Sequence, residues 1–65
     1  MARQVFRPGQ TVALRSRVGL SPVTPSLFQV QMRLTDSRGR SMYRIRNNQH
    51  DYERVEPGSN LAPQD

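Results

Sequence analysis

The strongest constraint on the fold is a run of alternating side chains between residues 27 and 34. The apolar positions of this run are Phe28, Val30, Met32 and Leu34. A period of two is that of a β-strand with one buried face, since successive side chains point to opposite sides of a sheet. The run therefore predicts a half-buried strand whose outward positions are Gln29, Gln31 and Arg33.

A tight turn and a second strand follow. The segment Asp36-Ser37-Arg38-Gly39 has Asp first and Gly last, which is the pattern of a type I turn. Residues 42–46 then alternate again, with Tyr43 and Ile45 on one face. Together the two runs predict an antiparallel hairpin. Its core positions would be Phe28, Val30, Leu34 and Ile45, and its outer positions would bring Arg33 near Arg44 or Arg46.

Turn signals divide the rest of the chain into short segments. Residues 1–7 are an arm that leads into the turn signal Arg7-Pro8-Gly9-Gln10. Residues 11–17 and 52–56 read as further strands, and two prolines make residues 18–26 a loop. Leu61 is the last apolar anchor, so we expect the polar tail 62–65 to fray.

A helix competes with the strands over residues 41–56. Met42, Ile45, Tyr52 and Val55 also fall at helical spacings. The pair Asn47-Asn48 in mid-segment and the strand preference of Tyr, Ile and Val favour strands instead.

The length of the chain limits the architecture to one small domain. A chain of 65 residues is too short for a two-sheet immunoglobulin-type sandwich. We therefore predict a single all-β domain over 1–65, a small SH3-like antiparallel barrel of about five short strands, with an OB-like barrel as the alternative.

Several short motifs resemble a group of small, mostly uncharacterised bacterial proteins. These motifs are Phe6-Arg7-Pro8-Gly9-Gln10-Thr11-Val12, Phe28-Gln29-Val30, Tyr43-Arg44-Ile45-Arg46, Glu53-Arg54-Val55 and Leu61. The chain departs from the group's pattern at Gln10, where the group has Asp, and at Glu56, where it has a second Val. The resemblance implies an SH3-like or Tudor-like barrel, and it transfers no catalytic residue.

The composition argues against catalysis and cofactors. The chain has no Cys and a single His, His50, so it offers neither a thiolate cluster nor a multi-histidine zinc site. His50 and Asp51 are neighbours and point to opposite faces of an extended segment, which prevents a simple relay. We therefore expect no enzyme activity, no metal and no cofactor. No run of residues approaches a membrane span and the N-terminus has no secretion signal, which predicts a cytoplasmic protein with no membrane partner.

The charge points to an anionic partner. All ten basic residues are Arg, five residues are acidic, and no acid precedes Asp36, so the excess of +5 lies in the first half. Guanidinium groups bind phosphates well, and the alternative is that these arginines are simply solvated and have no partner. We predict a small binding module that contacts nucleic acid, or an acidic protein surface, weakly through an Arg-rich sheet face formed by Arg15, Arg17, Arg33, Arg44 and Arg46.

The loop 18–25 supports a different function. Its apolar side chains and its prolines would suit a protein–protein interaction module or a self-associating subunit such as a homodimer. The residues for this alternative are Val18, Leu20, Pro22, Val23 and Pro25.

Overall fold

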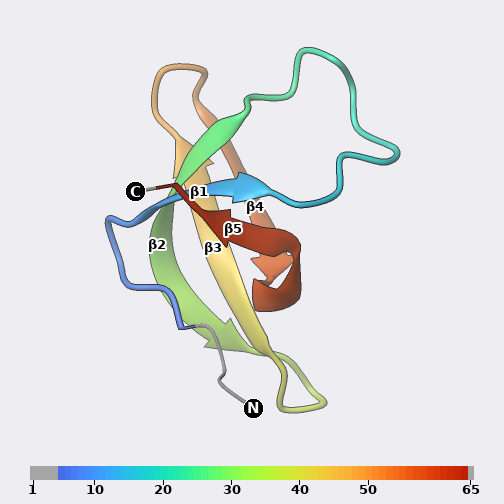
Figure 1. Cartoon of the computed structure of the whole chain (residues 1–65). Helices are drawn as coiled ribbons and strands as arrows, with labels where there is room; N and C mark the ends of the chain where they lie inside the picture. The colour runs from blue at the N-terminus through green and yellow to red at the C-terminus, as the bar shows by residue number, and fades with distance from the viewer. Residues whose placement is uncertain (1–4, 65) are drawn as a thin grey trace.

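The computed structural model of the chain describes residues 5–64 and is all-β (Figure 1). Its five strands form one antiparallel sheet in the order β4-β3-β2-β1-β5. The strands are β1 (Thr11–Leu14), β2 (Leu27–Thr35), β3 (Ser41–Asn47), β4 (Tyr52–Pro57) and β5 (Leu61–Pro63), with a short 3₁₀ turn, η1 (Gly58–Asn60), before β5. The all-β prediction is confirmed, and residues 41–56 form strands rather than a helix. Within residues 5–64, no helix has the length and apolar character needed to cross a membrane.

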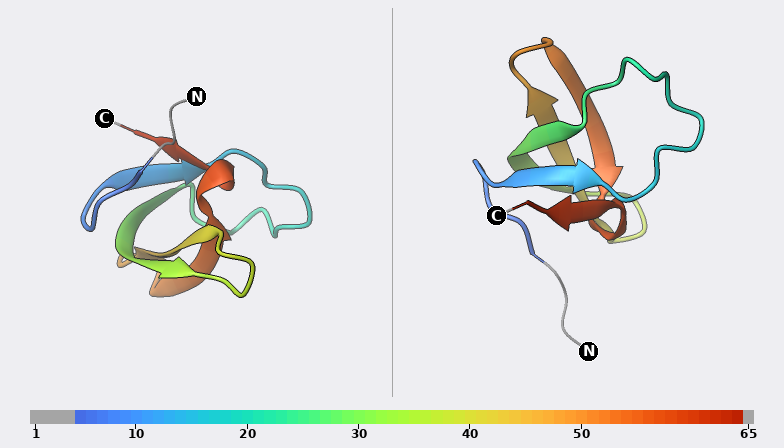
Figure 2. Two further views of the ribbon diagram at one scale, coloured as in Figure 1. Left: turned by 90° about the horizontal axis from the view of Figure 1, so that it is seen from below. Right: turned by 45° about the horizontal axis from the view of Figure 1, so that its top comes forward.

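The sheet curls around a single core. β1 and β5 lie side by side across the front of β3 in Figure 1, and the view from below in Figure 2 shows the curled, barrel-like outline. The core lies inside the curl and consists of Phe6, Val12, Leu14, Phe28, Val30, Tyr43, Ile45 and Leu61. The predicted core positions on β2 and β3 are therefore right, with the exception of Met32, which is exposed, and Leu34, which is only half-buried.

A β-bulge in β2 explains this exception. Val30 pairs with Ile45, but the next paired residue is Met32, opposite Arg44, so Gln31 is an extra residue on β2. Because side chains alternate with a period of two, one extra residue moves every later side chain to the other face. Met32 and Leu34 consequently leave the core side, and Arg33 lies opposite Tyr43.

The bulge results from two local constraints on the pairing of β2 with β3, whose registers differ by one residue. At one end of the hairpin, Val30 and Ile45 are both buried and set the pairing. At the other end, the turn closes through hydrogen bonds from the Gly39 N–H to the Asp36 carbonyl and from the Asp36 N–H to the Arg40 carbonyl, both 3.0 Å. Gly39 has φ +77°, which a glycine adopts without strain, as in a type I turn followed by a left-handed residue. The extra residue of the bulge accommodates the one-residue difference between the two registers, and it bends β2.

The described part of the N-terminal arm packs against the core. Phe6 meets the ring of Tyr43 edge-on, with centroids 5.3 Å apart, and its N–H lies 3.4 Å from the Tyr43 hydroxyl. Gly58 closes over the same ring, because a Cβ added there would lie 3.1 Å from Tyr43 Cε2. Residues 5–7 of the predicted arm are thus part of the fold, and residues 1–4 lie outside the described residues.

The C-terminal segment pairs with β1 as a strand of the sheet. Ala62 and Pro63 pair with Ala13 and Val12, and the Gln64 N–H donates to the Thr11 carbonyl at 3.0 Å. The prediction that residues 62–65 fray is wrong for 62–64, because β1 offers an open edge that this segment satisfies; Asp65 lies outside the described residues. The strand predicted over 11–17 ends at Leu14, where the Arg15 N–H turns to the Asn60 carbonyl at 2.8 Å.

The inward side of β4 carries two charged residues, Arg54 and Glu56, beside Tyr52, which packs against the core. Glu56 is buried, with Oε2 2.6 Å from Arg54 Nε and with Oε1 accepting a hydrogen bond from Asn60 Nδ2 at 2.9 Å. Asn60 Oδ1 also accepts from the Ser16 N–H at 2.9 Å. This network ties β4 and η1 to the end of β1, and it leaves Val55 on the outward side of β4.

Candidate functional site

Within residues 5–64, each acidic side chain has an arginine within 4.0 Å. Within residues 5–64 the four ion pairs are Asp36–Arg40 and Glu56–Arg54 at 2.6 Å, Glu53–Arg44 at 4.0 Å, and Asp51–Arg46. In the same part of the chain, five arginines have no carboxylate within 4.0 Å: Arg7, Arg15, Arg17, Arg33 and Arg38. The excess positive charge therefore resides on these five side chains.

Three of the five line one open groove of about 870 Å³, which we call the arginine groove. Its walls contain no acidic residue, and all four of its arginines are exposed. The lining residues are Val5, Arg15, Arg33, Arg38, Gly39, Arg40, Ser41, Pro57, Gly58 and Ser59.

Three separate elements deliver the arginines to the groove. The bulge in β2 turns Arg33 to the side of Tyr43, where its Nη2 donates to Ser41 Oγ at 3.0 Å. Arg38 and Arg40 come from the β2–β3 turn, which lies at the bottom of Figure 1. Arg15 follows β1, and its Nε donates to the Leu61 carbonyl at 3.1 Å. A backbone carbonyl and a hydroxyl thus orient the guanidiniums of Arg15 and Arg33 without compensating their charge.

Asp36 organises the turn that carries Arg38 and Arg40. Its Oδ1 accepts the N–H groups of Arg38 and Arg40 at 2.8 Å, and its Oδ2 accepts Arg40 Nε at 2.6 Å. The Arg40 N–H is the main reason that the pKa of the Asp36 carboxyl lies below its ordinary value, and the Arg40 guanidinium and the Arg38 N–H add to the effect. The carboxylate holds Arg40 by Nε at the rim of the groove.

The structure separates the five arginines that the sequence grouped together. Arg15 and Arg33 line the groove. Arg44 and Arg46 project from the other face of β3, beside Glu53 and Asp51, so the expectation that Arg33 lies near them is wrong. The bulge is the physical reason, because it reverses the side on which Arg33 points.

Arg17 holds the loop rather than the sheet face. Its Nη1 donates to the Pro25 carbonyl at 2.9 Å and its Nη2 to the Thr24 carbonyl at 2.6 Å. Sequence reasoning missed Arg38 and Arg40 as site residues. The signal for them was the Arg-Gly-Arg sequence at the hairpin turn, which the alternation of the strands does not cover.

The loop 18–25 divides into buried and exposed side chains. Val18 and Val23 are 92% and 84% exposed, and Pro22 is exposed as well. Leu20 packs against the core and Pro25 is buried, so these two of the predicted interaction residues serve the fold.

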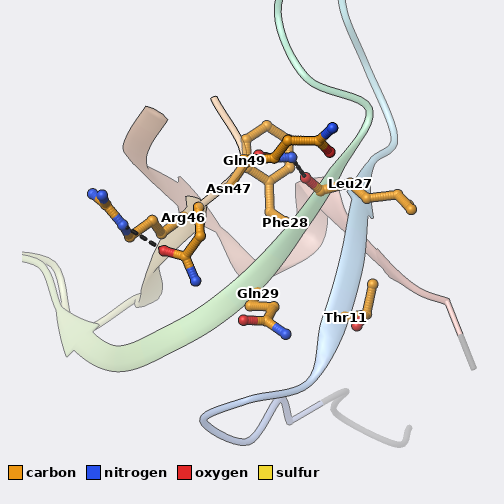
Figure 3. Close-up of a pocket in the computed structure, with 8 residues that line it drawn as sticks. Thr11, Leu27, Phe28, Gln29, Arg46, Asn47 and Gln49 are labelled. Carbon is orange, nitrogen blue, oxygen red and sulfur yellow. Dashed lines mark hydrogen bonds between the residues drawn. The ribbon is translucent and has the colours of Figure 1, made fainter. Parts of the chain in front are cut away.

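A second, smaller pocket lies at the start of β2 (Figure 3). It has a volume of about 280 Å³ and is lined mainly by amide and hydroxyl side chains, with Thr11 and Gln29 along one wall. Its one charged residue, Arg46, already bonds Asn48 Oδ1 at 2.7 Å and pairs with Asp51. The Asn47 amide likewise donates to the Leu27 carbonyl at 2.9 Å. This pocket therefore offers less to an anion than the arginine groove does.

Comparisons with protein-family models, with curated proteins and with solved structures give no match to this chain. The resemblance to small bacterial proteins stays a prediction from the motifs alone. Within residues 5–64, no three His, Cys, Asp or Glu side chains gather in a way that would hold a metal ion. The functional interpretation accordingly rests on the arginines.

Proposed function

We propose that this chain is a small nucleic-acid-binding module that contacts the phosphate backbone through the arginine groove. The observation that carries the proposal is the gathering of Arg15, Arg33 and Arg38, three arginines without a carboxylate partner, around one groove without acidic lining. Guanidinium groups bind phosphate oxygens through two parallel donors, and neutralising successive phosphates releases counterions.

The composition of the groove favours contacts to phosphates over contacts to bases. No aromatic side chain lines it, and the nearest rings, Phe6 and Tyr43, are buried in the core. Base stacking on aromatic side chains is the usual contact of single-strand binders. Contacts to phosphates alone carry no sequence information, so we expect binding that is independent of sequence and sensitive to salt.

Titration of unrelated duplex and single-stranded oligonucleotides across a salt series tests the proposal. The test variants are Arg33→Gln and Arg38→Gln, and the control is Arg7→Gln, which removes an unpaired charge outside the groove lining. Each groove variant should weaken binding of every sequence alike and lower the log–log salt slope by about 0.9 for duplex or about 0.7 for single strands.

The control variant separates the groove from net charge. Arg7→Gln should change affinity much less than either groove variant. An equal loss in all three variants would assign binding to net charge alone, and no binding at about 50 mM salt would overturn the proposal, since phosphate contacts are strongest at low salt.

The exposed tip of the loop supports a second candidate function, a protein-interaction module. Val18 and Val23 are nearly fully exposed on a loop whose shape Arg17 maintains, and ordered apolar side chains in solvent are typical anchors of protein contacts. If this function holds, Val18→Ser together with Val23→Ser should abolish capture of the protein partner while leaving nucleic-acid titrations unchanged.

A further inference from the structure

The outward side of β2, β3 and β4 carries an apolar patch that the core does not use. The register places Met32, Arg44 and Val55 in one row across the three strands, and Leu34, Met42 and Pro57 in the next. Met32 is 38% and Val55 46% exposed, and the other three apolar residues are half-buried. We call these six residues, together with Glu53, the outer sheet face.

The bulge creates this patch. A regular β2 strand would direct Met32 and Leu34 to the side of Phe28 and Val30, as their alternation predicts. The extra residue Gln31 instead places both on the outer sheet face, next to Met42 and Val55. The chain thus exposes adjacent apolar side chains on three neighbouring strands, a type of surface that marks interaction sites in soluble proteins.

The charges of the outer sheet face are self-complementary. Arg44 and Glu53 are each a little under half exposed, and their closest atoms, Nε and Oε2, are 4.0 Å apart, so neither is consumed by a tight ion pair. The Arg44 guanidinium lies over the patch, with Nη2 2.9 Å from Met32 Sδ. Across a two-fold axis, the Arg44 of each copy can approach the Glu53 of the other, because an isologous contact pairs each residue with its counterpart reciprocally.

The net charge of the chain limits where two copies can meet. The chain carries +5, and like-charged surfaces repel. The outer sheet face contains one Arg and one Glu, and Arg46, which lies opposite Glu53 on the same side, is paired with Asp51, so this side has no excess charge, whereas the arginine groove is strongly positive. An acidic partner would favour the groove, and a neutral apolar face with one charge of each sign fits a second copy of the same chain.

We propose that the outer sheet face is the contact between two copies of this chain in a weak, two-fold symmetric dimer. The patch has five apolar side chains, three of them half-buried, which is few beside the roughly 20–30 residues a side of a standard interface, so the dimer should form at high protein concentration and dissociate on dilution. The two surfaces meet at one shared residue, Pro57, and none of the four arginines of the groove belongs to the outer sheet face, so the contact leaves these arginines outside the interface.

Sedimentation of the full chain over a concentration series tests the dimer. The mass should rise from monomer toward dimer as concentration increases, and Val55→Lys should keep the chain monomeric. Val23→Lys is the matched control, since it adds the same charge at an exposed valine on the loop. A monomer at every concentration overturns the proposal, as does a dimer that Val23→Lys abolishes and Val55→Lys does not.

A charge-reversal experiment tests the two-fold pairing itself. It substitutes Arg44 and Glu53, whose exposed side chains can be changed without disturbing the core. Arg44→Glu and Glu53→Arg should each weaken self-association about tenfold or more, because like charges then face each other twice. Mixing the two variants should restore dimerisation, since each chain then offers the charge that the other lacks. Circular dichroism establishes that both variants are folded. Folded variants that do not associate on mixing overturn the proposal.

Discussion

At the residue scale, Asp36 connects the fold to the candidate site. Its two carboxylate oxygens have separate tasks: Oδ1 accepts the N–H groups of Arg38 and Arg40, and Oδ2 holds the Arg40 guanidinium. One side chain therefore closes the turn and places a cation beside the groove. The lowered pKa of the carboxyl means that the folded chain stabilises the charged form.

The variant Asp36→Asn separates these two tasks. A carboxyl whose pKa is lowered on folding stabilises the fold above its unfolded pKa, about 3.9, and this contribution is lost as pH falls through the lower folded value. The wild-type chain should therefore lose stability on acidification through this range. Asp36→Asn keeps an oxygen for the two N–H groups and should lose this part of the pH dependence.

Urea denaturation at neutral pH and at several acidic values measures the effect. A second variant, Asp36→Ala, removes the acceptor as well and should be less stable than Asp36→Asn at every pH, because the N–H groups of the turn lose their partner. Identical pH profiles for the wild type and Asp36→Asn would contradict the assignment.

At the element scale, the bulge in β2 decides the character of two surfaces. It turns Arg33 toward the arginine groove and Met32 toward the outer sheet face. Bulges also bend and twist the strand that holds them, which suits a strand that must curl around a core of eight side chains.

Deletion of Gln31 tests what the bulge contributes. Without it, Val30 and Met32 become adjacent and can keep their present partners, Ile45 and Arg44, in a regular ladder. We expect the faces of residues 32–35 to be retained and the loss of the bend to cost about 1–3 kcal/mol, in the usual range of structural substitutions. The measurements are urea denaturation and nuclear Overhauser contacts between Met32 and Arg44.

The control for this deletion is Gln31→Ala, which shortens an exposed side chain and keeps the residue count. It should shift stability by less than about 0.5 kcal/mol. If the deletion is as stable as this control, β2 does not need its bend. If Arg33 instead contacts Arg44 in the deletion variant, residues 32–35 have changed faces, and the turn does not set the pairing register of β2 with β3.

The sequence predicts where the strands and turns lie better than it predicts which side chains of each strand point toward the core. Alternation and turn residues identify the hairpin, the Asp36–Gly39 turn and buried Phe28, Val30 and Ile45, because each signal lies within a few residues. The site depends on the register between two strands, and that register results from a competition between the core and the turn. No pattern along one strand contains information about that competition, and alternation alone therefore predicts Arg33 on the same face as Arg44.

Long-range contacts explain the other differences. On β4, the network of Glu56 with Arg54 and Asn60 places two charged side chains inward and leaves Val55 on the outward side. The polar tail pairs with β1, which is about 50 residues away in the chain. Neither contact follows from local composition.

At the scale of the whole molecule, one small core supports every surface feature. Ile45 is fully buried at the centre of the sheet, between β2 and β4. Ile45→Ala should cost about 2–5 kcal/mol, which is comparable to the total stability of a domain this small. Thermal denaturation should show a largely unfolded variant, whereas Ile45→Val should stay folded with a loss of about 0.5–1.5 kcal/mol. A folded Ile45→Ala variant of near wild-type stability would contradict a single cooperative core.

The groove and the outer sheet face together predict how affinity depends on the length of the nucleic acid. A dimer carries two arginine grooves, so a long duplex can occupy both while a short duplex occupies one, and a second, linked contact raises the overall affinity without any new type of contact. The chain is 33 Å in its longest dimension, so a duplex of about 20 base pairs, at about 3.4 Å each, spans two copies. Titrations with duplexes of about 8 and about 30 base pairs should show a preference for the longer one, beyond the simple gain in the number of sites. Val55→Lys should remove that preference and leave the affinity for the short duplex nearly unchanged, or slightly higher from its added charge. If Val55→Lys keeps the full preference for the long duplex, the two surfaces act independently and binding belongs to the monomer.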